Sequence, residues 1–179
     1  MYKRLSSKIL FSHPRITLIE DQIELPSGKQ ADYVWIDGWI GAVTVIPRNM
    51  DGKLLVESEY SYLPNDILFQ FPGGGIHPGE HPAVAANREL VEELNLYANT
   101  LYHIGSYLMD HRRSHALMHV FIGEECVPQT CIDRDEYEIG FGEHWLTEAE
   151  IDILIAEGKV VNAPMLSCWA IYKASKQQR

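Results

Sequence analysis

Three glutamates stand close together near the middle of the chain, in the segment 88–96, which reads RELVEELNL. Glu89, Glu92 and Glu93 fall within one third of a helix circumference at about 100° per residue. Three like charges at this spacing repel one another unless a cation lies among them or they face open water. Because Mg²⁺ prefers carboxylate oxygens together with water and phosphate oxygens, the spacing favours metal-assisted phosphate chemistry. A solvated acidic helix face is the alternative.

A glycine-rich loop precedes this segment. Residues 73–75 are all glycine, so the backbone there can approach a ligand or a metal without a Cβ in the way. The Pro-Gly pair at 78–79 favours a turn that leads the chain back toward a helix N-terminus. Arg88 can pair with Glu92, four residues on, or hold Glu80 in place. Loop and helix together would gather carboxylates and backbone groups at one place.

The helix that carries the glutamates is predicted to begin near Pro82 and to end near Asn95. Proline suits the first helical position, where its missing N–H would be unpaired anyway. Asparagine tolerates the left-handed conformation of a C-terminal cap. The other side of the helix is apolar and would pack on a sheet; its residues are Ala83, Val84, Leu90, Val91 and Leu94.

Strands are predicted on both sides of this helix. Before it, two runs around a turn at 26–29 predict an amino-terminal hairpin, and two more around a turn at 49–52 are predicted to pair with each other. These runs are Arg15–Leu25, Gln30–Ile36, Trp39–Ile46 and Lys53–Tyr60. After the helix we predict two strands and then an acidic loop, over Leu101–Met109, Leu117–Ile122 and Glu124–Glu138.

Two more helices are predicted near the carboxyl end. Thr147 and Glu150 have the spacing of a capping box for a helix over 147–156, which Gly158 ends. A last helix is predicted over 163–176, and one of its sides carries Leu166, Trp169, Ala170 and Lys173. Strands with a few helices that do not alternate strictly predict an α+β fold or a layered α-β-α sandwich rather than a Rossmann fold.

Composition limits the kinds of partner. The chain has 179 residues, of which 46% are hydrophobic, a size and composition typical of one globular domain. With 15 Lys and Arg against 25 Asp and Glu the net charge is −10, so nucleic acid is a poor ligand. We expect no membrane anchor, no secretion signal and a cytoplasmic location. Cys126, Cys131 and Cys168 have the spacing of neither a disulfide framework nor a structural zinc site.

The loop and the acidic helix together resemble the Nudix box of the Nudix hydrolase superfamily. Gly74 is followed after five residues by Glu80, and after seven more by the segment 88–96. Asn95 stands where the family has glycine, and asparagine is the next most tolerated residue at positive φ. The resemblance implies an α-β-α sandwich with a mixed sheet and an amino-terminal antiparallel hairpin. It also implies hydrolysis of a nucleoside diphosphate linked to another group.

The resemblance further implies roles for single residues. Glu89 and Glu93 would be the principal ligands of Mg²⁺ or Mn²⁺. Glu92 would be a further or water-mediated ligand, and the carbonyl of Gly73 an additional one. The residues that would brace the loop and the helix are Gly74, Glu80 and Arg88.

Beyond the box, the chain is similar to the ADP-ribose pyrophosphatase branch of the superfamily. The similar segments are 41–47, 51–56, 69–74 and 157–163. This similarity implies a homodimer in which the amino-terminal strands, residues 1–38, are exchanged and line the partner's substrate site. Residues 39–179 would form the Nudix hydrolase domain, with a nucleotide-derived small molecule as substrate rather than nucleic acid or a membrane.

Two segments depart from that branch. Glu59-Tyr60-Ser61 stands where the branch has Gln-Tyr-Arg, so an arginine that would face the diphosphate is missing. The segment 111–114 reads HRRS where the branch has a Pro-Gly-x-Ser turn. Arg112 or Arg113 could restore the positive charge, because guanidinium groups suit phosphate oxygens; a solvated basic turn is an equal alternative.

Several further residues are candidates by position. Trp35 is the preferred platform for a base, with core packing or a dimer contact as its alternative; for Trp39 we favour core packing or a dimer contact. Glu138 and Glu136, ranked equally and ahead of Glu143, lie where the branch often has a glutamate that acts as base, and a solvated acidic loop is the alternative. We do not predict zinc binding by His111, His115 and His119. Their even spacing of four residues would only place them on the same face of a strand.

The function predicted first is metal-dependent hydrolysis of the diphosphate bond of a nucleoside diphosphate sugar, ADP-ribose or a relative, to a nucleoside monophosphate and a sugar phosphate. The first alternative is a different nucleotide, such as GDP-mannose, a dinucleotide or a nucleoside triphosphate. The second is a Nudix-fold sensor that binds a nucleotide without cleaving it. The complete set of Nudix-box carboxylates argues against the sensor.

Overall fold

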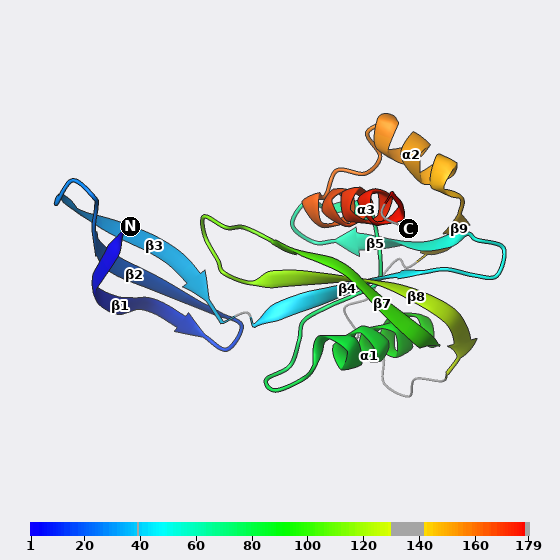
Figure 1. The fold of residues 1–179 in the computed structure, drawn as a ribbon, viewed down its shortest axis with the longest axis horizontal. Helices are drawn as coiled ribbons and strands as arrows, with labels where there is room; N and C mark the ends of the chain where they lie inside the picture. Colours follow the sequence, from blue (N-terminus) through cyan, green and yellow to red (C-terminus); the bar gives the residue numbers. More distant parts are fainter. Residues whose placement is uncertain (39, 130–141, 178–179) are drawn as a thin grey trace.

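The computed structural model describes residues 1–38, 40–129 and 142–177. In this part of the chain six strands precede the first helix, three strands follow it, and two helices end the chain (Figure 1). The elements in order are β1 (Lys3–His13), β2 (Ile16–Glu24), β3 (Gln30–Asp37), β4 (Gly41–Pro47), β5 (Leu54–Ser61), β6 (Asp66–Gln70), α1 (Pro82–Leu94), β7 (Leu96–Leu108), β8 (Leu117–Pro128), β9 (Gly142–Leu146), α2 (Glu148–Ala156) and α3 (Ala163–Lys176).

The amino-terminal strands form a sheet of their own. β1, β2 and β3 pair antiparallel in that order and extend away from the rest of the molecule (Figure 1). The predicted hairpin is confirmed as β2 and β3, and Gly28 with φ +83° allows the tight turn between them. The sequence pattern did not indicate β1, in which every residue is exposed and no apolar alternation is imposed.

The predicted pairing of the runs 39–46 and 53–60 is wrong. They form β4 and β5, which belong to two different sheets, ordered β4-β8-β7 and β6-β5-β9. All seven residues of β4 are buried, as is typical of a central strand with both faces covered. Its two edges are taken by the parallel strand β8 and by the backbone of residues 72–75, so β5 cannot lie beside it.

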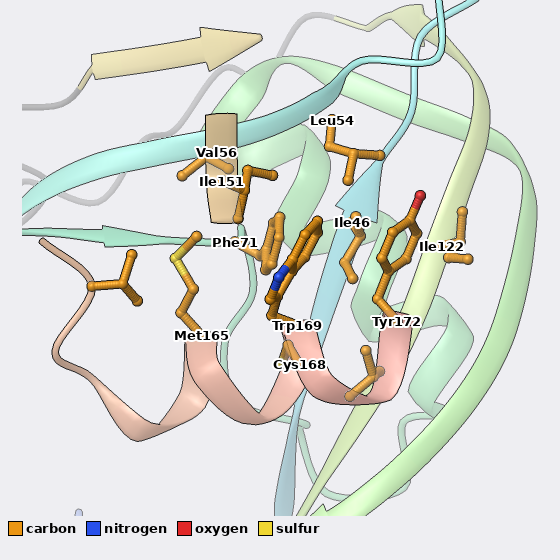
Figure 2. Packing of buried hydrophobic residues seen from close by; sticks show 12 residues of the cluster. Ile46, Leu54, Val56, Phe71, Ile122, Ile151, Met165, Cys168, Trp169 and Tyr172 are labelled. Carbon is orange, nitrogen blue, oxygen red and sulfur yellow. The ribbon is translucent and has the colours of Figure 1, made fainter. Parts of the chain in front are cut away.

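Helices cover both sides of the two sheets and create two cores. Because side chains alternate along a strand, Val43 and Val45 of β4 pack toward α1, whereas Ile46 packs toward α2 and α3. On the latter side Trp169 and Tyr172 of α3 lie among aliphatic residues of β4, β5 and β8 (Figure 2). The result is the predicted α-β-α arrangement.

All three predicted helices are confirmed, with corrections to their buried faces. Asn95 caps α1 in the left-handed conformation (φ 54°), and Thr147 and Glu150 form the capping box of α2. Val84 does not pack on the sheet as predicted; it is 60% exposed. α3 buries a different set from the four residues along its predicted side; only Trp169 is common to both sets. The buried residues are Met165, Cys168, Trp169 and Tyr172.

The predicted acidic loop begins later than expected. β8 continues through Glu124 to Pro128, since Ala98 and Leu96 of β7 provide pairing partners as far as that end. Cys126 and Cys168 are free thiols. No helix in the described residues is both long and apolar enough to span a bilayer.

Leu90 connects α1 to the sheets and is completely buried. Leu90→Ala should lower the free energy of unfolding by about 2–5 kcal/mol, because it removes apolar contacts and leaves a cavity. Denaturant unfolding measures the change. Val84→Ala on the exposed side of the same helix is the control, and its free energy of unfolding should stay within about 0.5 kcal/mol of the parent. Equal losses in both variants would contradict this packing.

Candidate active site

The glycine loop lies directly on β4. Val45 N–H donates to the carbonyl of Pro72 (2.8 Å) and Val43 N–H to the carbonyl of Gly74 (2.9 Å). Along a strand in an antiparallel pair, every second carbonyl points to the same neighbour. The carbonyls of Pro72 and Gly74 point to β4, so the carbonyl of Gly73 between them points away from β4. A Cβ at Gly73 would lie 2.1 Å from the carbonyl oxygen of Val43. A residue with a side chain cannot take this position without moving the loop off β4.

Two of the predicted carboxylates lie against this loop. Gly73 N–H donates to Glu93 Oε2 (2.8 Å). At Gly74 a Cβ would lie 2.5 Å from Glu89 Oε1, so the absent side chain leaves the room that this carboxylate fills. Glu89 is only 8% exposed. Burial raises its pKa, the neighbouring Arg88 opposes that rise, and the nearby carboxylates of Glu92 and Glu80 add to it.

Arg88 holds the acidic groups together from the other side. Its Nε and Nη2 donate to the two oxygens of Glu80 (3.0 and 3.1 Å), and Nη1 donates to Glu89 (2.8 Å) and Glu92 (2.9 Å). Nη2 also donates to the carbonyl of Gly75 (2.7 Å). The hydrogen bonds to Glu80 are the largest cause of a raised pKa of Arg88, and they lower the pKa of Glu80. Arg88 thus contacts both partners that its spacing predicted.

This arrangement fits a hard divalent cation. The carboxylates of Glu89 and Glu93 and the carbonyl of Gly73 are oxygen donors collected around two glycines that have no side chain to block them. Glu89 is buried beside other carboxylates, so positive charge there would compensate the desolvation and the repulsion. As they are placed, no three or more His, Cys, Asp or Glu side chains of the described residues converge closely enough to hold a metal by themselves.

Two carboxylates near the sheets were not identified from the sequence. Glu57 is completely buried on β5, and by strand alternation it lies on the α1 side, as Leu55 does. The signal available in the sequence was that Glu57 directly follows the apolar residues 54–56 of the same predicted strand. Glu59 accepts a hydrogen bond from Gln70 Nε2 (2.5 Å), and burial raises its pKa while that bond lowers it.

A cavity of about 370 Å³ adjoins the glycine loop on the side of α3. Its walls include the loop itself, Gln70 and three methionines, Met109, Met118 and Met165. Flexible methionine side chains adapt to irregular apolar shapes. The site therefore combines carboxylates on one side of the loop with an adaptable apolar hollow on the other.

A second cavity, of about 260 Å³, lies where the amino-terminal sheet meets the loop after β7. Trp35, Arg112 and Arg113, three residues predicted to bind substrate, all line it. Tyr33 Oη–H donates to the carbonyl of Arg112 (2.7 Å), and Ile36 N–H donates to the carbonyl of Arg113 (2.6 Å). Met109 and Met118 at the ends of the same connection line the first cavity, so one loop borders both.

Two of the predicted site residues, Glu136 and Glu138, lie outside the described residues, as does Trp39. Glu143, ranked behind the two glutamates, is exposed on β9.

The three histidines at spacing four do not come together. His111 and His115 line the second cavity, whereas His119 lies on β8. Ser106 Oγ is 3.0 Å from His119 Nδ1 and 2.9 Å from His103 Nε2, and so it bridges two histidines. Burial, His103 and His81 lower the pKa of His119. This Ser-His pair was not predicted, since its members come from two strands.

The chain is similar in sequence to a known family and to characterised relatives. A family model described as NUDIX domain matches residues 39–167. The chain is 30% identical over 138 residues to the ADP-ribose pyrophosphatase of Bacillus subtilis (strain 168), covering 75% of this chain and 74% of that protein. It is 26% identical, over the same shares of both chains, to the methanol dehydrogenase activator of Bacillus methanolicus.

Among solved structures, the crystal structure of an ADP compounds hydrolase superposes with a TM-score of 0.88 at 20% identity. It covers 99% of this chain and 95% of that one. At this level of identity the likeness shows a common fold that extends through the amino-terminal sheet.

The lowered pKa of His119 gives a pH dependence of stability. In the unfolded chain the pKa of His119 is near 6.5, whereas in the folded chain it is lower, so the unfolded chain binds a proton at His119 more readily. The contribution of His119 to the free energy of unfolding therefore falls as the pH drops through 6.5. His119→Asn keeps a hydrogen-bond acceptor near Ser106 but removes the titrating group. The Tm of this variant should therefore decrease less than the Tm of the parent protein between pH 7.5 and pH 5.5, the range around the unfolded pKa of His119. His111→Asn, an exposed site, is the control. Parallel Tm curves for His119→Asn and the parent protein would exclude this contribution.

Proposed function

The chain belongs to the Nudix family, and on that premise we propose that it hydrolyses the diphosphate bond of a nucleoside diphosphate sugar, ADP-ribose or a close relative. The products would be a nucleoside monophosphate and a sugar phosphate. Family membership makes the chain a Nudix pyrophosphohydrolase. The choice of ADP-ribose draws on the similarity to the Bacillus subtilis ADP-ribose pyrophosphatase.

One observation carries the proposal: the carboxylates of Glu89 and Glu93 lie against the backbone of Gly73 and Gly74, and Arg88 holds the acidic cluster. Most acidic helix faces are solvated, but here Glu89 is buried at a desolvation cost that raises its pKa. A group kept in such an environment is a candidate for function.

Mg²⁺ or Mn²⁺ is the cofactor we propose for this site. Glu89, Glu93 and the Gly73 carbonyl would hold it, with Glu92 as a further ligand. A bound divalent cation supplies positive charge against the diphosphate and makes nearby water more acidic. The Nudix family generally uses divalent metals, in keeping with an all-oxygen donor set.

The chain's own residues position the reaction. Arg88 fixes Glu80, Glu89 and Glu92 relative to the loop through its five hydrogen bonds. Arg112 and Arg113 lie at the second cavity and would offset the negative charge of the diphosphate, in place of the arginine that Ser61 replaces. Glu138 or Glu136 as the base remains a prediction.

Trp35 is proposed as the base platform, because its indole lines the second cavity and lies 5.5 Å from the His115 ring. The other nucleotides, GDP-mannose, dinucleotides and nucleoside triphosphates, are the alternative substrates, motivated by the altered segments 59–61 and 111–114. A nucleotide sensor is disfavoured by the complete carboxylate set on α1.

We further propose a homodimer with exchanged amino-terminal strands, with 1–38 as the exchanged part and 39–179 as the hydrolase domain. The projecting sheet (Figure 1) and the exposed apolar side chains of Ile9, Leu10 and Phe11 on β1 support it. A cytoplasmic location is the accompanying proposal.

The substrate panel tests the function. ADP-ribose, GDP-mannose, other nucleotide sugars, dinucleotides and nucleoside triphosphates are incubated with Mg²⁺, with Mn²⁺ and with a chelator, and released phosphate esters are measured. We expect chelator-sensitive cleavage of ADP-ribose above all others. If another class of nucleotide is cleaved preferentially, that class replaces ADP-ribose as the proposed substrate. If no nucleotide is cleaved but one of them still raises the Tm of the protein, the nucleotide sensor is favoured.

Glu93→Gln tests the carboxylate cluster. The amide oxygen can still accept the hydrogen bond from Gly73 N–H, so the fold and Tm should be retained. The loss of charge should reduce kcat at least about 100-fold, the scale of losing one electrostatic contact at a reaction centre. Glu157→Gln, at an exposed glutamate after α2, is the matched control. Full activity of Glu93→Gln would remove this face of α1 from the mechanism.

A further inference from the structure

The cavity between the amino-terminal sheet and the loop after β7 contains a buried carboxylate that the proposed function does not yet use. Asp21 lies on β2 directly opposite Tyr33 of β3, and both residues line the cavity. Trp35, two residues after Tyr33, lies on the same face of the sheet. Asp21 is 92% buried, since only 8% of its surface is exposed.

The two oxygens of Asp21 differ in their surroundings. Oδ2 accepts a hydrogen bond from Trp35 Nε1 (3.0 Å) and lies 3.9 Å from a guanidinium nitrogen of Arg4. Oδ1 is buried and has no hydrogen-bond partner in the described part of the chain. Buried carboxylate oxygens without partners are rare, because desolvation is costly when no hydrogen bond replaces water. Trp35 and Arg4 both approach Oδ2, so Oδ1 is the oxygen that is left without a donor from the described residues.

The walls of the cavity are held in place by contacts within the chain. Tyr33 Oη–H and Ile36 N–H bond to the loop carbonyls of Arg112 and Arg113. The rings of Trp35 and His115 lie 5.5 Å apart at 57°. A volume of about 260 Å³ is below the roughly 300–1,000 Å³ of pockets for drug-sized ligands. The space suits one ring system with the remainder of the ligand outside.

The chemistry of the lining defines that ring. Aromatic side chains favour a flat ring, and an unpartnered acceptor oxygen favours an N–H donor on the edge of the ring. A phosphate is excluded next to Asp21 by charge repulsion, but it suits the basic loop residues Arg112 and Arg113. A nucleotide whose base carries an amino group meets both requirements.

We propose that Asp21 is a specificity-determining residue, whose Oδ1 accepts a hydrogen bond from the 6-amino group of adenine. The inference rests on the proposed function, in which an adenine nucleotide is the substrate, and it assigns base selection to β2 rather than to the aromatic platform. Trp35 supplies ring contact for any base, whereas Asp21 distinguishes an amino group from hydrogen at the same position.

Two nucleoside monophosphates test the inference without any turnover. AMP and purine riboside 5′-monophosphate differ only in the 6-amino group, and their Kd values for the full-length protein are measured by calorimetry with Mg²⁺ present. We expect AMP to bind about tenfold more tightly, which is the scale of a hydrogen bond to a charged group. Equal Kd values for the two nucleotides would overturn the proposal.

Asp21→Asn is the informative variant. Its amide oxygen can accept from Trp35 Nε1 and then presents an NH₂ group in place of Oδ1. The preference for AMP should disappear, while the Kd of purine riboside 5′-monophosphate changes less than about threefold. Asp32→Asn, an exposed aspartate on the same sheet, is the control and should keep the preference. Equal weakening of both nucleotides in Asp21→Asn would show a merely structural role.

The two hypotheses fail in different ways. An Asp21-dependent preference for AMP together with no cleavage of any nucleotide would leave the base assignment standing and overturn the hydrolysis. Chelator-sensitive cleavage of ADP-ribose without a preference for AMP would support the hydrolysis and overturn the role of Asp21 in base selection.

Discussion

The close approach of the Gly73 backbone to β4 is the constraint on which the site depends. With the loop hydrogen-bonded along the edge of a buried strand, its free N–H is available to Glu93, and the space beside Gly74 is available to Glu89. A side chain at either position would separate the loop from the strand or from the helix. Secondary structure alone would place the helix on the sheet, but the glycines determine how deeply its carboxylates are buried.

Arg88 resolves the electrostatic conflict that this depth creates. Several carboxylates face one region, and without a positive charge their repulsion and desolvation would favour protonation or a shift of the helix. One guanidinium contacts three of them together with a loop carbonyl. The apolar positions opposite, Leu90 and Leu94, fix the helix to the sheets, so burial and ion pairing act on the same element from opposite sides.

Local signals in the sequence predicted well what local interactions decide. The caps of α1 and α2, the β2–β3 hairpin and the contacts of Arg88 all follow from residues a few positions apart. Long-range pairing was less accessible: β4 and β5 adjoin in sequence but join different sheets, and the exposed face of β1 carries no periodic signal. Asp21 and Tyr33 became neighbours only through strand register, and Trp35 meets His115 only through packing of the amino-terminal sheet on a distant loop.

The separation of the amino-terminal sheet from the body has a consequence for how such a protein can change during evolution. The side chains around the smaller cavity come from β2, β3 and one loop, while the acidic cluster comes from α1 and the glycine segment. Substitutions that remodel one set need not disturb the other. A lineage can therefore change the lining of the smaller cavity through substitutions in strands that contribute nothing to the two described cores, while the acidic cluster is inherited unchanged.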